Sequence, residues 1–313
     1  MDDLLSDRES EAMVQALQIT LFAKLDIRRN GMALARLPAK AEELLCYLLL
    51  RPGRPHTREA LACELWADAP AAQSKKYLRQ CLWQLQQALE PAEAAHPALL
   101  RVEHEWVGVH PDAAIEVDVA QFERAFAGVR DQPGAALSAQ QAQQAQQAAA
   151  LYQGELLSGW YQSWCMVERE RYESMFFALL DRLIEYCLAR GQLGQGIAYG
   201  MRLLRSDYTH ERTHCQLMQL YALAGDRSMA LRQFEQCAAA LAREFGVRPT
   251  EQTLALYQRI RAGELGPALA APAAAPPDRD TLTALLSDLA SLRGSIAQLQ
   301  NDVEQIKRSL CGP

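Results

Sequence analysis

The heptad spacing of apolar residues near the end of the sequence constrains the fold of this chain more than any other feature. Apolar side chains occupy every a and d position over four heptads: Leu282, Leu285, Leu289, Leu292, Ile296, Leu299, Val303, Ile306 and Leu310. This unbroken stripe predicts a coiled coil over residues 281–310. Oppositely charged residues at the flanking g and e positions, Asp288 with Arg293 and Asp302 with Lys307, favour a parallel homo-oligomer. We expect a homodimer. A homotrimer is the alternative, because the a positions mix Leu with β-branched residues.

The stretch Gln73–Glu90 predicts an amphipathic helix whose polar face suits DNA. Leu78, Leu82, Leu85 and Leu89 recur at helical spacing, so one side of the helix must pack on a core. The opposite face carries cations and amides and no acid before Glu90: Lys75, Lys76, Arg79, Gln80, Gln86 and Gln87. Such a face can lie against phosphates and offer amide groups to base edges. An ordinary solvated surface helix is the alternative, because three cations on one helix are common.

The order of elements around this helix predicts a winged helix over residues 15–112, preceded by a disordered acidic N-terminus over residues 1–14. Apolar residues on odd positions from Leu17 to Ile27 predict a strand, and Asn30-Gly31 predicts a tight hairpin. Two helical stretches follow, the second capped by Thr57. Two short strands, 99–102 and 106–109, come after the Gln73–Glu90 helix. In a winged helix of this order the third helix enters the major groove.

The chain beyond residue 116 is densely helical. The Ala/Gln tract 135–150 favours helix over a disordered spacer. Gly191 and Gly225 lie 34 residues apart, which is the period of tetratricopeptide (TPR) hairpins. We therefore expect a TPR-like repeat domain over residues 116–262, followed by an Ala/Pro-rich linker over residues 263–280. A packed helical bundle without a ligand is the alternative.

One polar cluster in the helical region is a candidate ligand site. Arg202, Arg205, Asp207 and Tyr208 would suit an anionic or aromatic molecule, such as a small metabolite or a second messenger. The alternative is a solvated helix end, where such a run is common.

Composition limits the remaining functions. The chain has 313 residues and a net charge of −6, whereas residues 18–110 hold 12 Lys and Arg against 10 Asp and Glu. Only the N-terminal third therefore has a sign suited to DNA. The eight cysteines are dispersed, which predicts reduced thiols in a cytoplasmic protein. We expect no signal peptide, membrane span, catalytic motif, cofactor or metal site, and His210 and His214 lack a third ligand.

Several segments resemble the SARP and BTAD group of bacterial transcription regulators, which join a winged helix of the response-regulator output type to a TPR-like bacterial transcriptional activator domain. The resembling segments are LRPGRPHTREALACELWADAP (50–70), KKYLRQCLWQLQQALE (75–90), EVDVAQFERAF (116–126), LYQGELLSGWYQSWCMVERERYE (151–173) and ALRQFEQCAAALAREFGVRPTEQT (230–253). The resemblance implies DNA binding by the third helix and activation through contact with RNA polymerase. It places Lys75, Lys76, Arg79, Gln80 and Trp83 on or beside the DNA-facing helix, to which we add Gln86.

The sequence departs from the family pattern at two places. Gln84, Gln86 and Gln87 stand where relatives often carry Arg, and Glu103-His104-Glu105 forms the hairpin turn where a small or basic turn is usual. A single copy should therefore bind DNA weakly, and a coiled-coil dimer could recover affinity. The leading hypothesis is a DNA-binding transcriptional regulator. The rival is an assembly scaffold that does not bind DNA and whose winged helix has degenerated.

Overall fold

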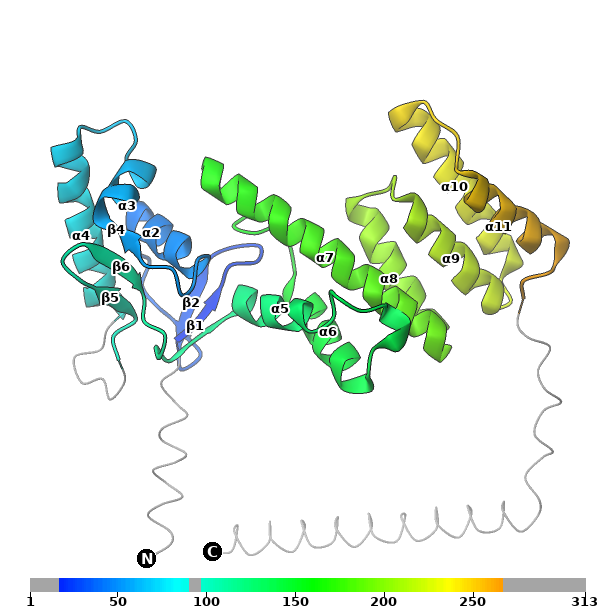
Figure 1. Ribbon diagram of the computed structural model, residues 1–313, viewed down its shortest axis with the longest axis horizontal. Coiled ribbons are helices and arrows are strands. Elements are labelled where there is room, and N and C mark those ends of the chain that lie inside the picture. The colour runs from blue at the N-terminus through cyan, green and yellow to red at the C-terminus, as the bar shows by residue number, and fades with distance from the viewer. Residues whose placement is uncertain (1–16, 90–96, 267–313) are drawn as a thin grey trace, which may run out of the picture.

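The computed structural model describes residues 17–89 and 97–266. The expected coiled coil, residues 1–14 and most of the expected linker lie outside the described residues. The described chain is mainly helical with a small amount of sheet near its N-terminal end, as the sequence predicts. The molecule is elongated, and helix α4 lies near one end while α10 and α11 lie at the other (Figure 1).

The first sheet has the strand order β3-β2-β1-β7. Its strands are β1 (Leu17–Thr20), β2 (Asp26–Arg29), β3 (Met32–Ala33) and β7 (Ile115–Val117). The single strand expected from Leu17 to Ile27 is wrong, because Ala23 takes a left-handed conformation with φ 65° and the chain turns back to pair β2 with β1. The hairpin at Asn30-Gly31 is confirmed: both residues have positive φ, and β2 pairs antiparallel with β3.

Three helices and a hairpin follow in the expected order. They are α2 (Ala39–Leu49), α3 (Arg58–Leu65), α4 (Ala71–Leu89), β5 (Leu100–Val102) and β6 (Trp106–Val109), and β4 (His56–Thr57) pairs with β6. The Thr57 hydroxyl accepts a hydrogen bond from the Ala60 backbone N–H at 3.2 Å, so the predicted cap of α3 is confirmed. Because Thr57 also belongs to β4, the start of α3 is tied to the hairpin.

The helices of the second part are α5 (Asp118–Ala127), α6 (Ala139–Leu151), α7 (Ser163–Arg190), α8 (Leu193–Ser206), α9 (Glu211–Leu223), α10 (Arg227–Phe245) and α11 (Glu251–Ala262), with a short 3-10 turn at Gly134–Ala136. Helix α6 confirms that the Ala/Gln tract is helical, and Ser138 with Gln141 forms its capping box. From α7 onward each helix packs on the next. Gly191 and Gly225 both take the left-handed conformation, at φ 69° and 83°, just after α7 and α9.

A continuous core joins the N-terminal part to the helical part. The ring of Phe22, which follows β1, packs against the rings of Phe122 in α5 and Tyr172 in α7 at 5.3 and 5.6 Å between centroids. Trp164 of α7 meets Tyr47 of α2 edge-on at 5.5 Å. One cluster of buried apolar residues includes side chains of both parts. The shared core therefore fixes the orientation of α2 relative to α7.

Asp118 makes a polar connection at the same junction. The sequence around it predicts a capping box with Gln121, whereas the N-cap residue of α5 is Val117 and makes no side-chain cap bond. The Asp118 carboxylate accepts hydrogen bonds from the backbone N–H groups of Leu21 and Phe22, each at 2.9 Å. The capping prediction is wrong because the carboxylate satisfies the end of β1, and β7 brings it there.

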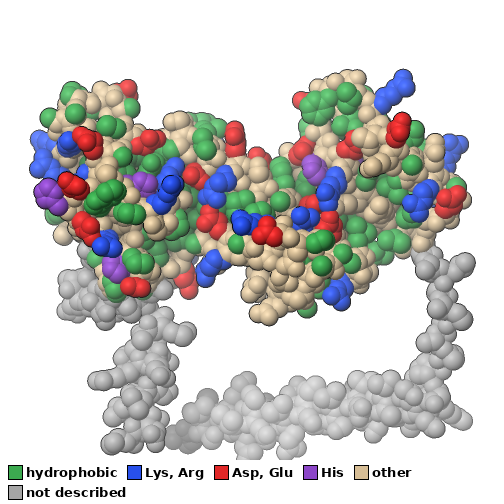
Figure 2. All heavy atoms as spheres, viewed as in Figure 1, with side chains coloured by type: hydrophobic (Ala, Val, Ile, Leu, Met, Phe, Trp, Pro, Cys, Tyr) green, Lys and Arg blue, Asp and Glu red, His purple; other side chains and the backbone are tan. Residues whose placement is uncertain are grey.

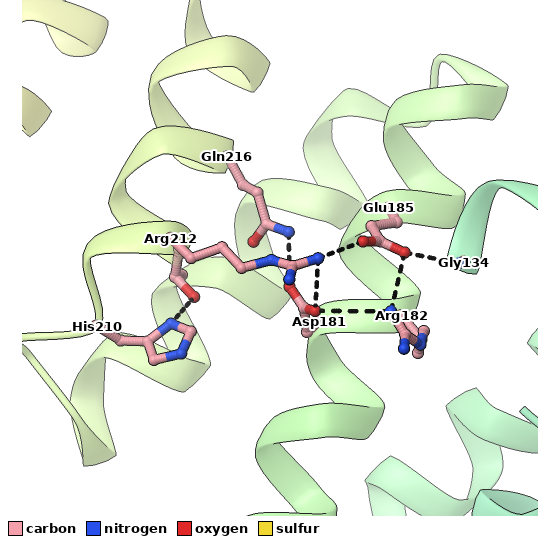
Figure 3. A network of polar contacts seen from close by, with 8 residues as sticks. Gly134, Asp181, Arg182, Glu185, His210, Arg212 and Gln216 are labelled. Carbon is pink, nitrogen blue, oxygen red and sulfur yellow. Dashed lines mark hydrogen bonds and ion pairs between the residues drawn. The ribbon is translucent and has the colours of Figure 1, made fainter. Parts of the chain in front are cut away.

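A polar network joins α7 to α9 and to the 3-10 turn (Figure 3). Arg212 of α9 lies 3.1 Å from an oxygen of Asp181 and 2.5 Å from an oxygen of Glu185, both on α7. The other oxygen of Glu185 accepts from the backbone N–H of Gly134 at 2.6 Å. A Cβ at position 134 would lie 2.1 Å from the Arg182 carbonyl oxygen, so only glycine allows this approach. The network holds three segments in a fixed arrangement.

No helix within residues 17–89 and 97–266 has the length and apolar character needed to cross a membrane. In that same part of the chain, no three His, Cys, Asp or Glu side chains gather in a way that could hold a metal ion. The cysteines described there are free thiols.

Candidate nucleic-acid interface

Helix α4 has one buried face and one exposed face, as its sequence predicts. Leu78, Leu82, Leu85 and Leu89 are each at most 4% exposed and pack in the core. At the C-terminal end of α4, the guanidinium of Arg29 donates to the Leu89 carbonyl oxygen. This contact fixes α4 against β2. The buried face thus determines which side chains of α4 point outward.

The outward face carries a stripe of cationic, amide and aromatic side chains. Lys76, Arg79, Gln80, Trp83 and Gln87 are all exposed, at the three- and four-residue spacing of one helix face. Trp83 is 60% exposed in the middle of this stripe. Amide and guanidinium groups can bond base edges, and an exposed indole can contact sugars or a thymine methyl group. We call this set of five residues the α4 stripe.

The cations of α4 differ in how far the protein already neutralises them. Lys75 lies beside the stripe, and its Nζ is 3.0 Å from a carboxylate oxygen of Glu59 on α3. Within the described chain neither Lys76 nor Arg79 forms an ion pair, and the first turn of α4 contains no acid. Lys76 and Arg79 are the most available for phosphate.

The β5–β6 hairpin beside α4 is held in place but is not basic. The backbone N–H of Arg58 at the start of α3 donates to the Glu105 carbonyl at 2.9 Å, and Arg58 Nε donates to the Glu103 carbonyl at 3.2 Å. Glu103, His104 and Glu105 are all exposed. Arg101 neutralises only Glu103, with which it pairs at 2.5 Å. The hairpin could therefore fit against DNA through its shape, but it adds little positive charge to the interface.

Figure 2 shows Lys and Arg side chains at the outer edge formed by α4, next to acidic side chains and a histidine. All five residues that the family resemblance predicts on the DNA-facing helix are exposed on α4: Lys75, Lys76, Arg79, Gln80 and Trp83. Gln86 is half-buried at the border of the stripe, whereas Gln87, which was not among the predicted contacts, is exposed. The helical period of the sequence would have favoured Gln87, because it lies four residues after Trp83.

The four residues predicted as a ligand site lie in two different environments. They are Arg202, Arg205, Asp207 and Tyr208. Arg202 donates to the Tyr152 carbonyl oxygen, and its guanidinium lies 4.7 Å from the centre of the Phe176 ring. The Asp207 carboxylate accepts from Thr209 N–H at 3.0 Å. Both side chains are thus engaged within the fold. Arg205 and Tyr208 line a groove of about 420 Å³ together with residues from α8, α9 and α10.

The groove contains residues that sequence reasoning missed. Besides Arg205 and Tyr208, its lining is Met201, Leu204, His214, Gln236, Ala239, Ala240 and Arg243. From the sequence, His214 is expected only as part of an incomplete metal site, and no role is predicted for Arg243. The residues come from separate helices, so no short motif contains them. The offset between Tyr208 and Arg243, close to one repeat period, is the signal that could have suggested the pairing.

The helical part of the chain matches a model of a known protein family. Residues 117–261 match the family model described as the bacterial transcriptional activator domain. No curated protein gives a match. Among solved structures, the chain is similar to EmbR of Mycobacterium tuberculosis in complex with a low-affinity phosphopeptide, with a TM-score of 0.63 and 20% identity. The alignment covers 79% of this chain and 65% of the EmbR chain, which is a likeness of fold.

Proposed function

We propose that this chain, which belongs to the SARP/BTAD type of bacterial transcriptional regulators, binds double-stranded DNA through the exposed face of α4. In this proposal residues 15–112 are the DNA-binding winged helix, with α4 in the major groove. The β5–β6 hairpin lies over the neighbouring backbone. The family resemblance extends the proposal to transcriptional activation through contact with RNA polymerase.

The observation that carries the proposal is the α4 stripe. Lys76 and Arg79 are exposed cations without a carboxylate partner in the described chain, and Gln80 and Gln87 present amides along the same face. Phosphate contacts give affinity and position, and base-edge contacts give sequence preference. A single helix face that offers both kinds of group, on a helix fixed by buried leucines and Arg29, has the chemistry that major-groove recognition needs.

A single copy is expected to bind DNA weakly, so in this proposal the coiled coil serves to join two copies. The acidic hairpin turn and the glutamines of α4 limit the number of phosphate contacts. Two copies joined through residues 281–310 would bind two half-sites at a raised effective concentration, which adds roughly 10² to 10⁴ in affinity when the linker spans the sites. The TPR-like domain would then be the part that responds to a partner or ligand.

The test is a gel-shift series on the upstream region of the protein's own gene at two salt concentrations. The wild-type chain should give a specific shift that weakens steeply with salt. Lys75→Ala/Lys76→Ala/Arg79→Ala should abolish the shift without changing the oligomer. The matched control, Arg232→Ala/Arg248→Ala/Arg259→Ala, removes three exposed cations of the helical part and should leave the shift intact. Unchanged binding by the α4 variant would remove this helix from the proposal.

The acidic turn at Glu103–Glu105 favours one rival, an assembly scaffold that does not bind DNA. Its exposed carboxylates would repel the backbone of a duplex. The scaffold predicts no salt-sensitive shift on any fragment, together with an intact oligomer. The same gel series therefore separates the two functions.

A further inference from the structure

The groove between α8 and α10 combines an apolar floor with two cations at its edge. Met201 and Leu204 of α8 and Ala239 and Ala240 of α10 supply apolar surface. Arg205 and Arg243 are exposed and line the same groove, and the lining contains no carboxylate. A volume of about 420 Å³ falls in the range of small-molecule sites, which run from about 300 to 1,000 Å³.

The two guanidinium groups of the groove differ from those arginines of the helical part that pair with carboxylates. Arg171, Arg182 and Arg212 each pair with carboxylates of the protein. In the described chain neither Arg205 nor Arg243 forms an ion pair, and Arg243 lies 5.0 Å from the centre of the Tyr208 ring. The Tyr208 hydroxyl donates a hydrogen bond to the carboxylate of Glu244 just outside the groove, and the charge of this carboxylate also acts on Arg243. An anion in the groove would meet two guanidinium groups that form no ion pair within the described chain.

Hydrogen bonds hold Tyr208 and His214, which both line the groove, in place before any ligand binds. The buried His214 ring contacts the Tyr208 carbonyl oxygen through Nε2 at 3.0 Å and the Gln233 amide through Nδ1 at 2.6 Å. A neutral imidazole satisfies both contacts when Nε2 donates and Nδ1 accepts. Tyr208 is thus anchored through its backbone, its hydroxyl and its ring. A preformed site of this kind loses little conformational entropy on binding.

We infer that this groove binds a small amphipathic anion, a carboxylate, sulfonate or phosphate carried on an aromatic or short aliphatic body. The apolar body would lie along Met201, Leu204 and the two alanines, and the anionic group would lie between Arg205 and Arg243. A bound molecule would bridge α8 and α10, which belong to successive helical hairpins. The inference deepens the proposed role of the helical domain as a ligand-responsive module and rests on it.

The test uses two fluorescent probes of nearly equal shape on the full chain. Anilinonaphthalene sulfonate is an amphipathic anion, and N-phenyl naphthylamine is its neutral analogue. The wild-type chain should bind the sulfonate saturably at one site per chain. Arg205→Gln/Arg243→Gln should weaken sulfonate binding by about tenfold or more and leave the neutral probe unchanged. Arg248→Gln/Arg259→Gln, which removes two exposed cations outside the groove, should change neither.

A second variant tests the location independently of charge. Ala239 is exposed on α10, so Ala239→Phe fills the groove without adding bulk to the core, and it should reduce binding of both probes. Sulfonate binding that survives either Arg205→Gln/Arg243→Gln or Ala239→Phe would overturn the inference. Probe binding needs no DNA, so it can fail while the gel shift succeeds, or succeed while the gel shift fails.

Discussion

Lys76 and Arg79 are the residues on which the electrostatic part of DNA binding depends. Each phosphate contact that is lost lowers the slope of log K against log salt by about one. Lys76→Ala/Arg79→Ala should therefore reduce the slope by about two. Lys75→Ala should reduce it less, because Lys75 already pairs with Glu59. Equal slopes for the wild type and the double variant, measured by fluorescence anisotropy over a salt series, would show that these side chains do not contact phosphate.

His214 gives the helical part a pH-dependent stability. Burial lowers the pKa of this imidazole below 6.5. As the pH falls from 6.5 toward the folded-state pKa, the unfolded chain takes up a proton that the folded chain does not. The contribution is therefore present above pH 6.5 and is lost as the pH falls through this window. The free energy of unfolding should decrease on acidification.

His214→Gln should reduce that pH dependence, because the amide does not titrate in this range. The measurement is the urea midpoint at about pH 7.5 and about pH 5. His56 also has a lowered pKa because it is partly buried, so part of the dependence should remain in the variant. His104→Gln, at the exposed turn of the hairpin, serves as the matched control. An unchanged difference between the two midpoints in His214→Gln would contradict this account.

At the scale of elements, Asp118 connects β1, β7 and α5. Its carboxylate accepts from the backbone N–H groups of Leu21, Phe22 and Val119 in a buried position. Asp118→Ala leaves these donors without a partner, which should cost about 3 kcal/mol or more. Asp118→Asn keeps one acceptor oxygen and should cost less. Urea denaturation of the full chain followed by circular dichroism measures both, and equal stability of wild type and Asp118→Ala would contradict the assigned role.

The sequence predicted elements best where one local pattern decides the structure. The leucines of α4, the Asn30-Gly31 turn and the cap at Thr57 are each determined by neighbours within a few residues, and the structure has all three. The parallel pairing of Leu17 with Ile115 was not predicted, because it joins residues that are distant in sequence. The turn at Ala23 was missed for a related reason: Phe22 pairs with Leu156, and no local signal encodes that contact.

The two candidate sites also differ in how far they could be predicted from local sequence patterns. The α4 stripe lies on one helix, so its helical period could be read directly, apart from the exchange of Gln86 for Gln87. The groove takes Arg205, Tyr208 and Arg243 from different segments. Its composition therefore depends on how successive helices stack, which a single sequence does not specify.

At the scale of the whole molecule, the proposed function needs two copies. The heptad residues lie outside the described part of the chain, so oligomerisation stays a prediction from the sequence. Leu289→Asp/Ile296→Asp places charges at two a positions and should convert the oligomer to a monomer. Analytical ultracentrifugation measures this change, and DNA affinity should fall by roughly 10² to 10⁴ with it. A chain that is monomeric before substitution would contradict the prediction.

The two ends of the molecule have different proposed tasks. Helix α4 lies near one end, and α10, which lines the groove, lies toward the other (Figure 1). One cluster of buried apolar residues extends from Leu17 to Leu203 in α8, and a separate cluster lies among α9, α10 and α11.

The central claim is that α4 contacts DNA, and footprinting of the full chain on its own upstream region tests it most directly. Wild-type protein should protect two half-sites in the major groove, separated by whole helical turns of about 10 base pairs. Lys75→Ala/Lys76→Ala/Arg79→Ala should remove the protection while circular dichroism and oligomeric state stay unchanged. Protection that survives in this variant, or its absence for the wild-type chain on every genomic fragment at low salt, would contradict the account.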